Sequence, residues 1–243
     1  MFPIRDSVRT TQTPVAVYSI IAINALVFFY QIRLSPNAAV DFSYTYGMVP
    51  AIYFDGTSRL RPGMALIDFL PFLSATFLHG GWLHIIFNMW TLLIFGSTLE
   101  GRMGTLQFMI FYLCCAVIST FAHGFFNEDS QVPVIGASGA IAGVIGAYAV
   151  RFPTARITLL MPIIFIPLIF TVPAVVFAAI WFGIQVLQSA WEALRPSMGG
   201  GIAWWAHIGG FVAGLVLLPV FLLFAPSPPR KREWRPGPWD YPD

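Results

Sequence analysis

Long stretches of apolar residues recur along this chain, and the last of them, residues 202–224, contains no Asp, Glu, Lys or Arg. About 20 consecutive apolar residues are enough for a helix to cross the hydrocarbon core of a bilayer. Charged residues make up only 10% of the chain, whereas a soluble domain carries about 25%. The sequence therefore excludes an ordinary soluble globule and predicts an all-α, polytopic membrane protein.

Six stretches of this kind predict one bundle of six transmembrane helices, because the polar segments between them are too short for a second domain. The expected spans are residues 14–30, 83–99, 105–124, 134–150, 173–191 and 202–224. Residues 1–13 are a polar N-terminal segment, and residues 225–243 are a Pro-rich basic tail that we expect to be disordered. The first loop, residues 31–69, mixes aromatic and charged side chains, which is typical of a segment embedded in the membrane interface.

Residues 157–172 are apolar but are interrupted by Pro162 and Pro167. Proline removes a helical hydrogen bond and clashes with the preceding turn. We therefore interpret this segment as an interfacial lead-in to the fifth span. Counting it as a span of its own is the alternative, and that count would place the basic tail outside the cell.

Basic residues are distributed unevenly between the two sides of the six-span bundle. The side of the termini holds nine of them: Arg5, Arg9, Arg102, Arg151, Arg156, Arg230, Lys231, Arg232 and Arg235. The other side holds four: Arg33, Arg59, Arg61 and Arg195. Because cytoplasmic loops carry the excess of Lys and Arg, both termini are expected in the cytoplasm. No organelle-type presequence is evident, so the expected location is the plasma membrane of a bacterium.

A serine lies among glycines at the start of the fourth span, in the sequence Gly136 to Gly139. Glycines 136, 139, 143 and 146 are spaced three, four and three residues apart, which on a helix gives one flat stripe for close packing. Ser138 lies at the edge of this stripe, so its hydroxyl is expected to point into a seam between helices. Polar groups within spans tend to face the protein interior or a wet cavity.

The sixth span carries a matching stripe, in which His207 shares a helical face with Ala203, Gly210 and Gly214. Close packing of the two stripes, through Gly143 and Gly146 on one side and Gly210 and Gly214 on the other, would bring Ser138 and His207 together. A serine and a histidine in contact can act as nucleophile and general base. The alternative is that His207 is only a structural hydrogen-bond partner.

The second span contributes His84 and Asn88, which are four residues apart and share one helical face, and His79 precedes them in the loop. Together with the backbone N–H of Ser138, His84 and Asn88 could donate hydrogen bonds to an oxyanion. Alternatively, they only bond neighbouring helices. None of the six predicted spans contains Asp or Glu. The sequence therefore predicts a Ser-His dyad rather than a triad with a carboxylate.

Three motifs together resemble the rhomboid intramembrane serine proteases: His79-x4-His84-x3-Asn88, the Gly136–Gly139 sequence, and Ala206-His207-Ile208-Gly209-Gly210. Glu100-Gly101-Arg102 resembles the family's helix-end motif, and the likeness covers residues 14–224. The resemblance implies a six-helix rhomboid bundle with a membrane-embedded first loop. It implies that Ser138 is the nucleophile and His207 the base. His84, Asn88 and the Ser138 amide would form the oxyanion hole, and His79, Gly136, Ala137 and Gly139 would line the site.

One position departs from the family pattern. Many members carry an aromatic residue four positions after the nucleophile, stacked on the histidine, whereas this chain has Ala142. Another group must then hold the imidazole, and Trp204, Trp205 or an aromatic residue from another span are the candidates.

The predicted activity is endoproteolysis of transmembrane-helix substrates near the outer membrane face, without a cofactor. Two other functions compete with it: a non-catalytic rhomboid-like protein that binds membrane clients, and a small transporter. A transporter would need a polar pathway through the midplane, and the spans show almost none. The four His and two adjacent Cys residues lack the spacing of a zinc site, and no nucleic-acid-binding patch is visible. The expected partners are transmembrane proteins and the bilayer, with no indication of oligomeric state.

Overall fold

The computed structural model describes residues 2–8, 10, 12–54, 64–163, 166–194 and 203–225. Most of the predicted C-terminal tail, from residue 226 onward, lies outside the described residues. So do Arg59 and Arg61 of the first loop, Arg195, and the glycines between the fifth and sixth predicted spans, residues 199–201.

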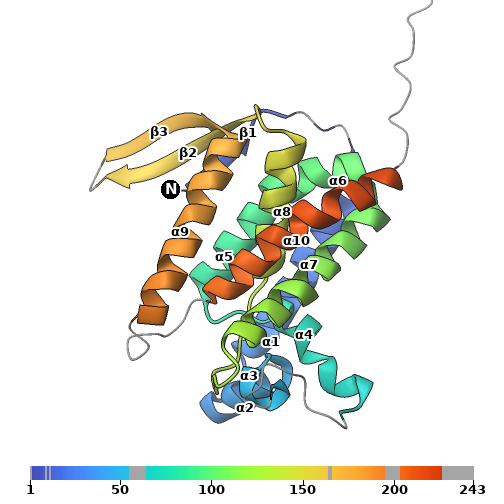
Figure 1. The fold of residues 1–243 in the computed structure, drawn as a ribbon, viewed down its shortest axis with the longest axis vertical. Helices are drawn as coiled ribbons and strands as arrows, with labels where there is room; N and C mark the ends of the chain where they lie inside the picture. The colour runs from blue at the N-terminus through green and yellow to red at the C-terminus, as the bar shows by residue number, and fades with distance from the viewer. Residues whose placement is uncertain are drawn as a thin grey trace, which may run out of the picture.

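A bundle of helices forms the body of the molecule (Figure 1). Its members are α1 (Val15–Gln31), α5 (Trp82–Thr91), η3 (Leu92–Gly96), α6 (Ser97–Met103), α7 (Thr105–Phe126), α8 (Ser138–Arg151), α9 (Ala174–Leu194) and α10 (Trp204–Leu223). The segments α5, η3 and α6 run on as one helix, Trp82–Met103, in which η3 is a π-helical stretch. Among the described residues, four helices are long and apolar enough to cross a membrane: Trp82–Met103, α7, α9 up to Trp191, and α10.

The other two predicted spans correspond to apolar helices that are shorter, with 17 residues in α1 and 14 in α8. The fourth predicted range starts at residue 134, but α8 begins only at Ser138 because Gly136 adopts a left-handed φ of 125°. Gly136 therefore belongs to the turn before the helix and does not extend the glycine stripe. The structure supports a helical membrane bundle, with four helices rather than six meeting the length expected of a full span.

The all-α expectation is wrong in one place, because the described chain also contains a three-stranded antiparallel sheet. Its strands are β1 (Phe2–Asp6), β2 (Arg156–Ile163) and β3 (Ile166–Pro173), with β2 in the centre. The segment interpreted as a lead-in, residues 157–172, is thus a hairpin. Pro162 lies beyond Leu160, the last β2 residue paired with β1, and faces only Pro167. Proline is tolerated where no neighbouring strand needs its N–H. The described residues of this segment form strands, which argues against a seventh helical span.

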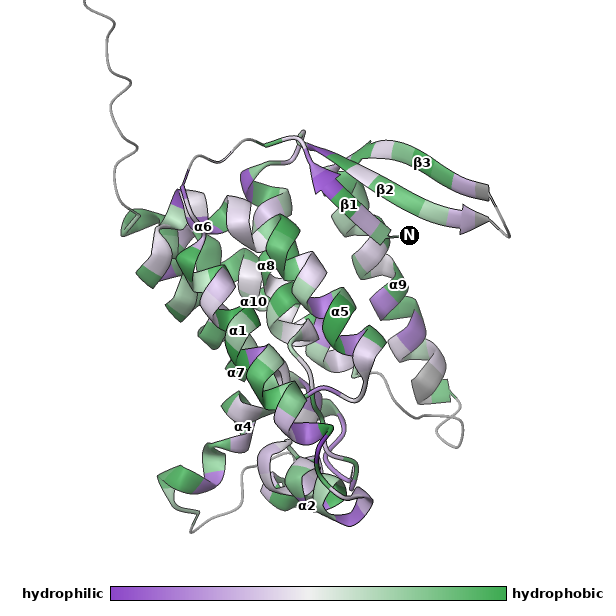
Figure 2. Ribbon diagram, turned by 180° about the vertical axis from the view of Figure 1, so that it is seen from behind, coloured by the Kyte–Doolittle hydropathy of each residue, from purple (hydrophilic) through white to green (hydrophobic). Residues whose placement is uncertain are grey.

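Short helices gather at the opposite end of the bundle from the sheet (Figure 1). They are α2 (Pro36–Tyr46), α3 (Pro50–Tyr53), η1 (Leu66–Phe69), α4 (Pro71–Ser74) and η2 (Ala75–Phe77). Leu66 and Ile67 are 90% and 70% exposed, as expected where a segment meets lipid rather than water. Figure 2 shows that hydrophobic residues, drawn in green, also run along the helices of the bundle. The interfacial position of the first loop stays a prediction.

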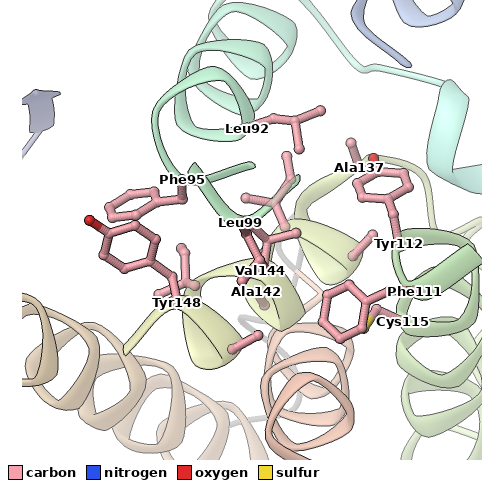
Figure 3. Packing of buried hydrophobic residues seen from close by; sticks show 14 of the residues in the cluster. Leu92, Phe95, Leu99, Phe111, Tyr112, Cys115, Ala137, Ala142, Val144 and Tyr148 are labelled. Carbon is pink, nitrogen blue, oxygen red and sulfur yellow. The ribbon is translucent and has the colours of Figure 1, made fainter. Parts of the chain in front are cut away.

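Helix α8 lies at the centre of the hydrophobic core, and all its residues from Gly139 to Ala149 are buried. Side chains from the α5–α6 helix and from α7 close around it, as Figure 3 shows for Phe95, Tyr112 and Cys115. The ring of Phe95 lies between those of Tyr148 and Phe177, with centroids 5.0 and 5.5 Å away. Because α8 is enclosed on several sides, its N-terminal residue has a fixed position.

Glu100 joins three helices at the end of the bundle near the sheet. Its buried carboxylate accepts hydrogen bonds from the backbone N–H groups of Ala16 and Val17, both at 2.9 Å, and from Thr105 Oγ1 at 2.8 Å. The first N–H groups of a helix have no partner within the helix. Glu100 satisfies two of them in α1 and thereby fixes this helix against α6 and α7.

Candidate active site

The turn at Gly136 places Ser138 as the first residue of α8. A side chain at position 136 would be strained at this φ, and its Cβ would lie 2.8 Å from Cε1 and Nε2 of His84. Position 136 therefore requires glycine for two reasons: its backbone conformation, and the closeness of the His84 ring, which leaves no room for a Cβ. The backbone N–H of Gly136 donates to Ala75 O at 2.8 Å, which fixes the turn.

The two predicted glycine stripes pack against each other, with α8 on one side and α10 on the other. A Cβ at Gly210 would overlap the carbonyl oxygen of Gly139, and one at Gly214 would overlap that of Gly143. Gly146 continues the contact, since its Cβ would lie 2.8 Å from the carbonyl oxygen of Phe211. Backbones approach this closely only where side chains are absent.

At the end of this seam Ser138 and His207 are in hydrogen-bonding contact, with 2.8 Å between Ser138 Oγ and His207 Nε2. Both side chains are partly exposed. The structure therefore brings together Ser138 and His207 as the sequence predicts, although the two residues are 69 positions apart along the chain.

Gln185 of α9 contacts the other ring nitrogen, with 2.7 Å between His207 Nδ1 and Gln185 Oε1. This residue was not among those predicted from the sequence. The rings of Trp181 and Trp204 also lie near His207, with centroids 5.8 and 6.0 Å away. Ala142, at the position where the resemblance led us to expect a stacking aromatic residue, is fully buried in the core. Groups from α9 and α10 thus surround the imidazole instead.

His84 lies on α5 beside this pair, and the hydrogen bond to its Nδ1 indicates its tautomer. The backbone N–H of Gly80 donates to His84 Nδ1 at 3.4 Å. A neutral imidazole that accepts at Nδ1 carries its proton on Nε2. Nε2 is one of the two His84 atoms nearest the Cβ position of Gly136, so this N–H lies beside the turn that precedes α8.

Asn88, one turn further along α5, is 7% exposed, and its Nδ2 has no hydrogen-bond acceptor among the described residues. Buried amide groups are usually hydrogen-bonded, so an unpartnered amide in this position is unusual. Its two N–H groups remain able to donate to an additional acceptor.

His79 is almost fully buried in the loop before α5, and its ring centroid lies 5.0 Å from that of His84. Its backbone N–H donates to Gln31 Oε1 at 3.1 Å. Burial, together with the neighbouring His84, lowers the pKa of His79 to about 3. The side chain is therefore neutral at physiological pH and packs against His84.

A cavity of about 670 Å³ opens at this end of the seam. It is lined by Gly80, Gly81, Trp82, Leu83, His84, Ile135, Ser138, Ala203 and His207. The lining includes Ser138, His84 and His207. It includes none of the four residues predicted to line the site, namely His79, Gly136, Ala137, which is fully buried, and Gly139, which packs on Ser119, and it also lacks Asn88. The described residues contain no group of three His, Cys, Asp or Glu side chains able to hold a metal ion.

Comparison with known protein families gives a match to the rhomboid domain over residues 68–224. The chain belongs to the rhomboid family. Relatives include the human "Presenilin-associated rhomboid-like protein, mitochondrial", 32% identical over 148 residues, and "Rhomboid protein 1, mitochondrial" of Saccharomyces cerevisiae, 26% identical over 152 residues. "RHOMBOID-like protein 4" of Arabidopsis thaliana is 30% identical over 151 residues.

These alignments cover 60%, 60% and 62% of this rhomboid, and 36%, 40% and 34% of the respective relatives. The chain thus matches little more than a third of each relative's length. Family membership and the long apolar helices together make it a multi-pass integral membrane protein.

Proposed function

We propose that this rhomboid is an intramembrane serine endopeptidase that uses Ser138 as nucleophile and His207 as general base. The supporting observation is the 2.8 Å contact between Ser138 Oγ and His207 Nε2 at the wall of a cavity. A general base must lie within about 2.6–3.2 Å of the atom whose proton it takes. The contact meets this requirement.

In the first step Ser138 Oγ attacks the carbonyl carbon of the scissile peptide, and its proton moves to His207 Nε2. The resulting imidazolium then gives that proton to the leaving amine as the C–N bond breaks. Water attacks the ester that remains and loses a proton to His207 Nε2. His207 then gives that proton to Ser138 Oγ as the C–O bond breaks and the acid leaves, which restores both residues.

The tetrahedral intermediates carry a negative oxygen, and we propose three groups as hydrogen-bond donors to it. The Ser138 amide is one of the first N–H groups of α8, which have no partner within the helix. His84 Nε2 lies beside the turn before α8, and Asn88 Nδ2 has no hydrogen-bond acceptor among the described residues. We propose that these groups form the oxyanion hole.

The proposed substrates are transmembrane proteins whose helices end in unstable, Gly- or Ala-rich turns. A peptide bond can reach Ser138 only after the helix around it unwinds, and unwinding exposes backbone groups that lipid cannot satisfy. A wet cavity at one end of the bundle would supply the missing hydrogen bonds.

The site is proposed to face outward, with the sheet end of the bundle in the cytoplasm. Among the described residues, Arg5, Arg102, Arg151 and Arg156 belong to the elements near the sheet. The sequence predicts a bacterial plasma membrane, whereas two of the relatives above are named mitochondrial. Fractionation of the native host's membranes, probed with an antibody to this chain, distinguishes the two locations.

The proposed function is tested by labelling purified protein with a fluorescent fluorophosphonate, together with cleavage of a transmembrane reporter substrate. Wild-type protein should be labelled and should cleave the reporter. Ser138→Ala should do neither, and His207→Ala should lose at least about 10²-fold in cleavage rate, the lower end of what general-base catalysis supplies.

Ser119→Ala is the matched control, because Ser119 packs in the same seam but does not line the cavity. It should remain labelled and active. A wild-type protein that is folded yet is neither labelled nor active would overturn the proposal and favour the client-binding function. Labelling that persists in Ser138→Ala would show that another group is the nucleophile.

A further inference from the structure

We propose that Gln185 is a positioning residue that holds His207 in the one tautomer able to accept the proton of Ser138. This inference rests on the proposed function. It starts from the two hydrogen bonds of the imidazole, 2.7 Å from Nδ1 to Gln185 Oε1 and 2.8 Å from Nε2 to Ser138 Oγ.

The orientation of the Gln185 amide is fixed by a second contact. Gln185 Nε2 donates to the backbone carbonyl of Trp181 at 3.2 Å. A carbonyl oxygen can only accept, so the NH₂ group must face Trp181 and Oε1 must face His207. Gln185 is also 5% exposed, so its amide is not free to turn in water.

The tautomer of His207 follows from this orientation. An oxygen acceptor at Nδ1 requires that Nδ1 carry the proton, which leaves a lone pair on Nε2. Nε2 can then accept from the Ser138 hydroxyl, as a general base must. In the opposite tautomer, Nε2–H would donate to Ser138 Oγ, and no proton could leave the serine.

Gln185 thus takes the place that a carboxylate occupies in a Ser-His-Asp triad, but it is neutral. It can orient the ring, and its carbonyl dipole assists the imidazolium less than a full negative charge does. Trp181, one turn before Gln185, brings its ring near the same imidazole. Helix α9 therefore supplies both the acceptor and an aromatic neighbour at a site where Ala142 provides no ring.

The test compares Gln185→Leu and Gln185→Glu in cleavage of a transmembrane reporter substrate across a range of pH. Leucine has a similar size but accepts no hydrogen bond, so kcat should fall by about 10²-fold, within the range of general-base effects. KM should change little, because Gln185 is absent from the cavity lining. A glutamate can still accept from Nδ1–H, so Gln185→Glu should retain most of the wild-type kcat.

The pH profile of kcat/KM distinguishes a positioning role of Gln185 from a purely structural one, because a structural role would leave the profile unchanged. A carboxylate beside Nδ1 favours the imidazolium, so Gln185→Glu should shift the acidic limb of the kcat/KM profile to higher pH. The described titratable side chains that also act electrostatically on His207 are His84 of α5 and His123 of α7. Both stay unchanged in the Gln185 variants, so a shift reports the new carboxylate.

Ser189→Ala is the matched control on α9. Ser189 lies one turn after Gln185, is 3% exposed, and its hydroxyl has no hydrogen-bond partner among the described residues. This variant should keep the wild-type kcat and pH profile. Thermal unfolding in detergent, measured for each variant, shows whether a loss of rate comes from loss of folded protein.

Wild-type kcat in folded Gln185→Leu would overturn the inference, and so would an unshifted acidic limb in Gln185→Glu. If Gln185→Leu fails to fold, the profile of Gln185→Glu decides alone, in the same two directions. Failure of the proposed function is a separate result, because wild-type protein would then show neither labelling nor cleavage.

Discussion

Two of the three hydrogen-bonded residues of the candidate active site, Ser138 and His207, could be predicted from the sequence, and the third, Gln185, could not. Ser138 and His207 could be paired from the sequence because each lies at the end of a glycine stripe, and the structure brings them to 2.8 Å. Gln185 could not be paired with them, because one amide in an apolar span has no motif around it. A weak signal was present, since Trp181, Gln185 and Ser189 recur every four residues on one face of α9. Only the three-dimensional structure shows that this face meets His207.

Replacement of Asn88 by alanine tests the proposed oxyanion hole. The loss of one oxyanion donor typically lowers kcat by about 10²–10³-fold, and we expect a fall at the lower end because His84 and the Ser138 amide remain. KM should stay near its wild-type value. Asn24→Ala is the control, because Asn24 is also a buried asparagine in a helix but bonds only to Ile20 O among the described residues. Equal rates for the wild type and Asn88→Ala would remove Asn88 from the site.

The pH dependence of stability tests the burial of His79. Burial lowers the pKa of this side chain from 6.5 to about 3. Between these values the unfolded chain binds more protons than the folded chain, so the folded state loses stability as the pH falls. Lowering the pH from about 7 to about 5 should therefore reduce the thermal midpoint of the wild type more than that of His79→Gln. The same decrease in both proteins would mean that His79 does not contribute.

At the scale of whole elements, the helices were predicted from the sequence but the strands were not. Each predicted span contains a helix, because apolar stretches of this length leave the backbone few other ways to satisfy its hydrogen bonds in lipid. The hairpin of β2 and β3 was missed because prolines in an apolar stretch indicate a broken helix as readily as a strand. In the structure Pro162 and Pro167 face each other at the far end of the hairpin. Whether these prolines disrupt a sheet depends on which strand lies beside them. The sequence does not show this, because β1, the neighbour of β2, comes from the distant N-terminal part of the chain.

The seam between α8 and α10 depends on backbone contact, and Gly214→Ala tests it. The new Cβ would overlap the Gly143 carbonyl oxygen, which is backbone and cannot turn away. Overpacking of this kind typically costs about 1–3 kcal/mol, so the thermal midpoint in detergent should fall. Gly183→Ala on α9 is the matched control, because a Cβ at that position would have no atom of the described residues within 4 Å beyond its own neighbours. Equal midpoints for the two variants would show that the seam tolerates wider spacing.

At the scale of the whole molecule, the distribution of basic residues indicates one orientation in the membrane. Arg5, Arg102, Arg151 and Arg156 lie in the elements near the sheet, and Glu100 fixes α1 at the same end. The opposite end carries the short helices of the first loop (Figure 1). On the positive-inside rule we therefore propose that the sheet lies in the cytoplasm and the cavity on the outer side.

Cysteine accessibility in intact cells tests this orientation. In a background where Cys114 and Cys115 are replaced by alanine, Gln131→Cys should react with a membrane-impermeant maleimide, because this exposed position lies in the loop before Ser138. Thr154→Cys, exposed next to β2, should react only after the cells are permeabilised. The reverse pattern would invert the proposed topology, and with it the side on which substrates are cut.

The pairing of β1 with β2 has a consequence for how the chain matures during synthesis. Phe2 pairs with Leu160, so β1 finds its partner strand only after residues 156–163 have been made. Contacts so distant in sequence form late, since the loop between them must first be ordered. Pro3 is buried and pairs with Leu159. In a Pro3→Cys variant without Cys114 and Cys115, the new thiol should therefore stay reactive in nascent chains that end before residue 156 and become protected in longer ones. The order of translation would then delay closure of the sheet until α1 to α8 have been made.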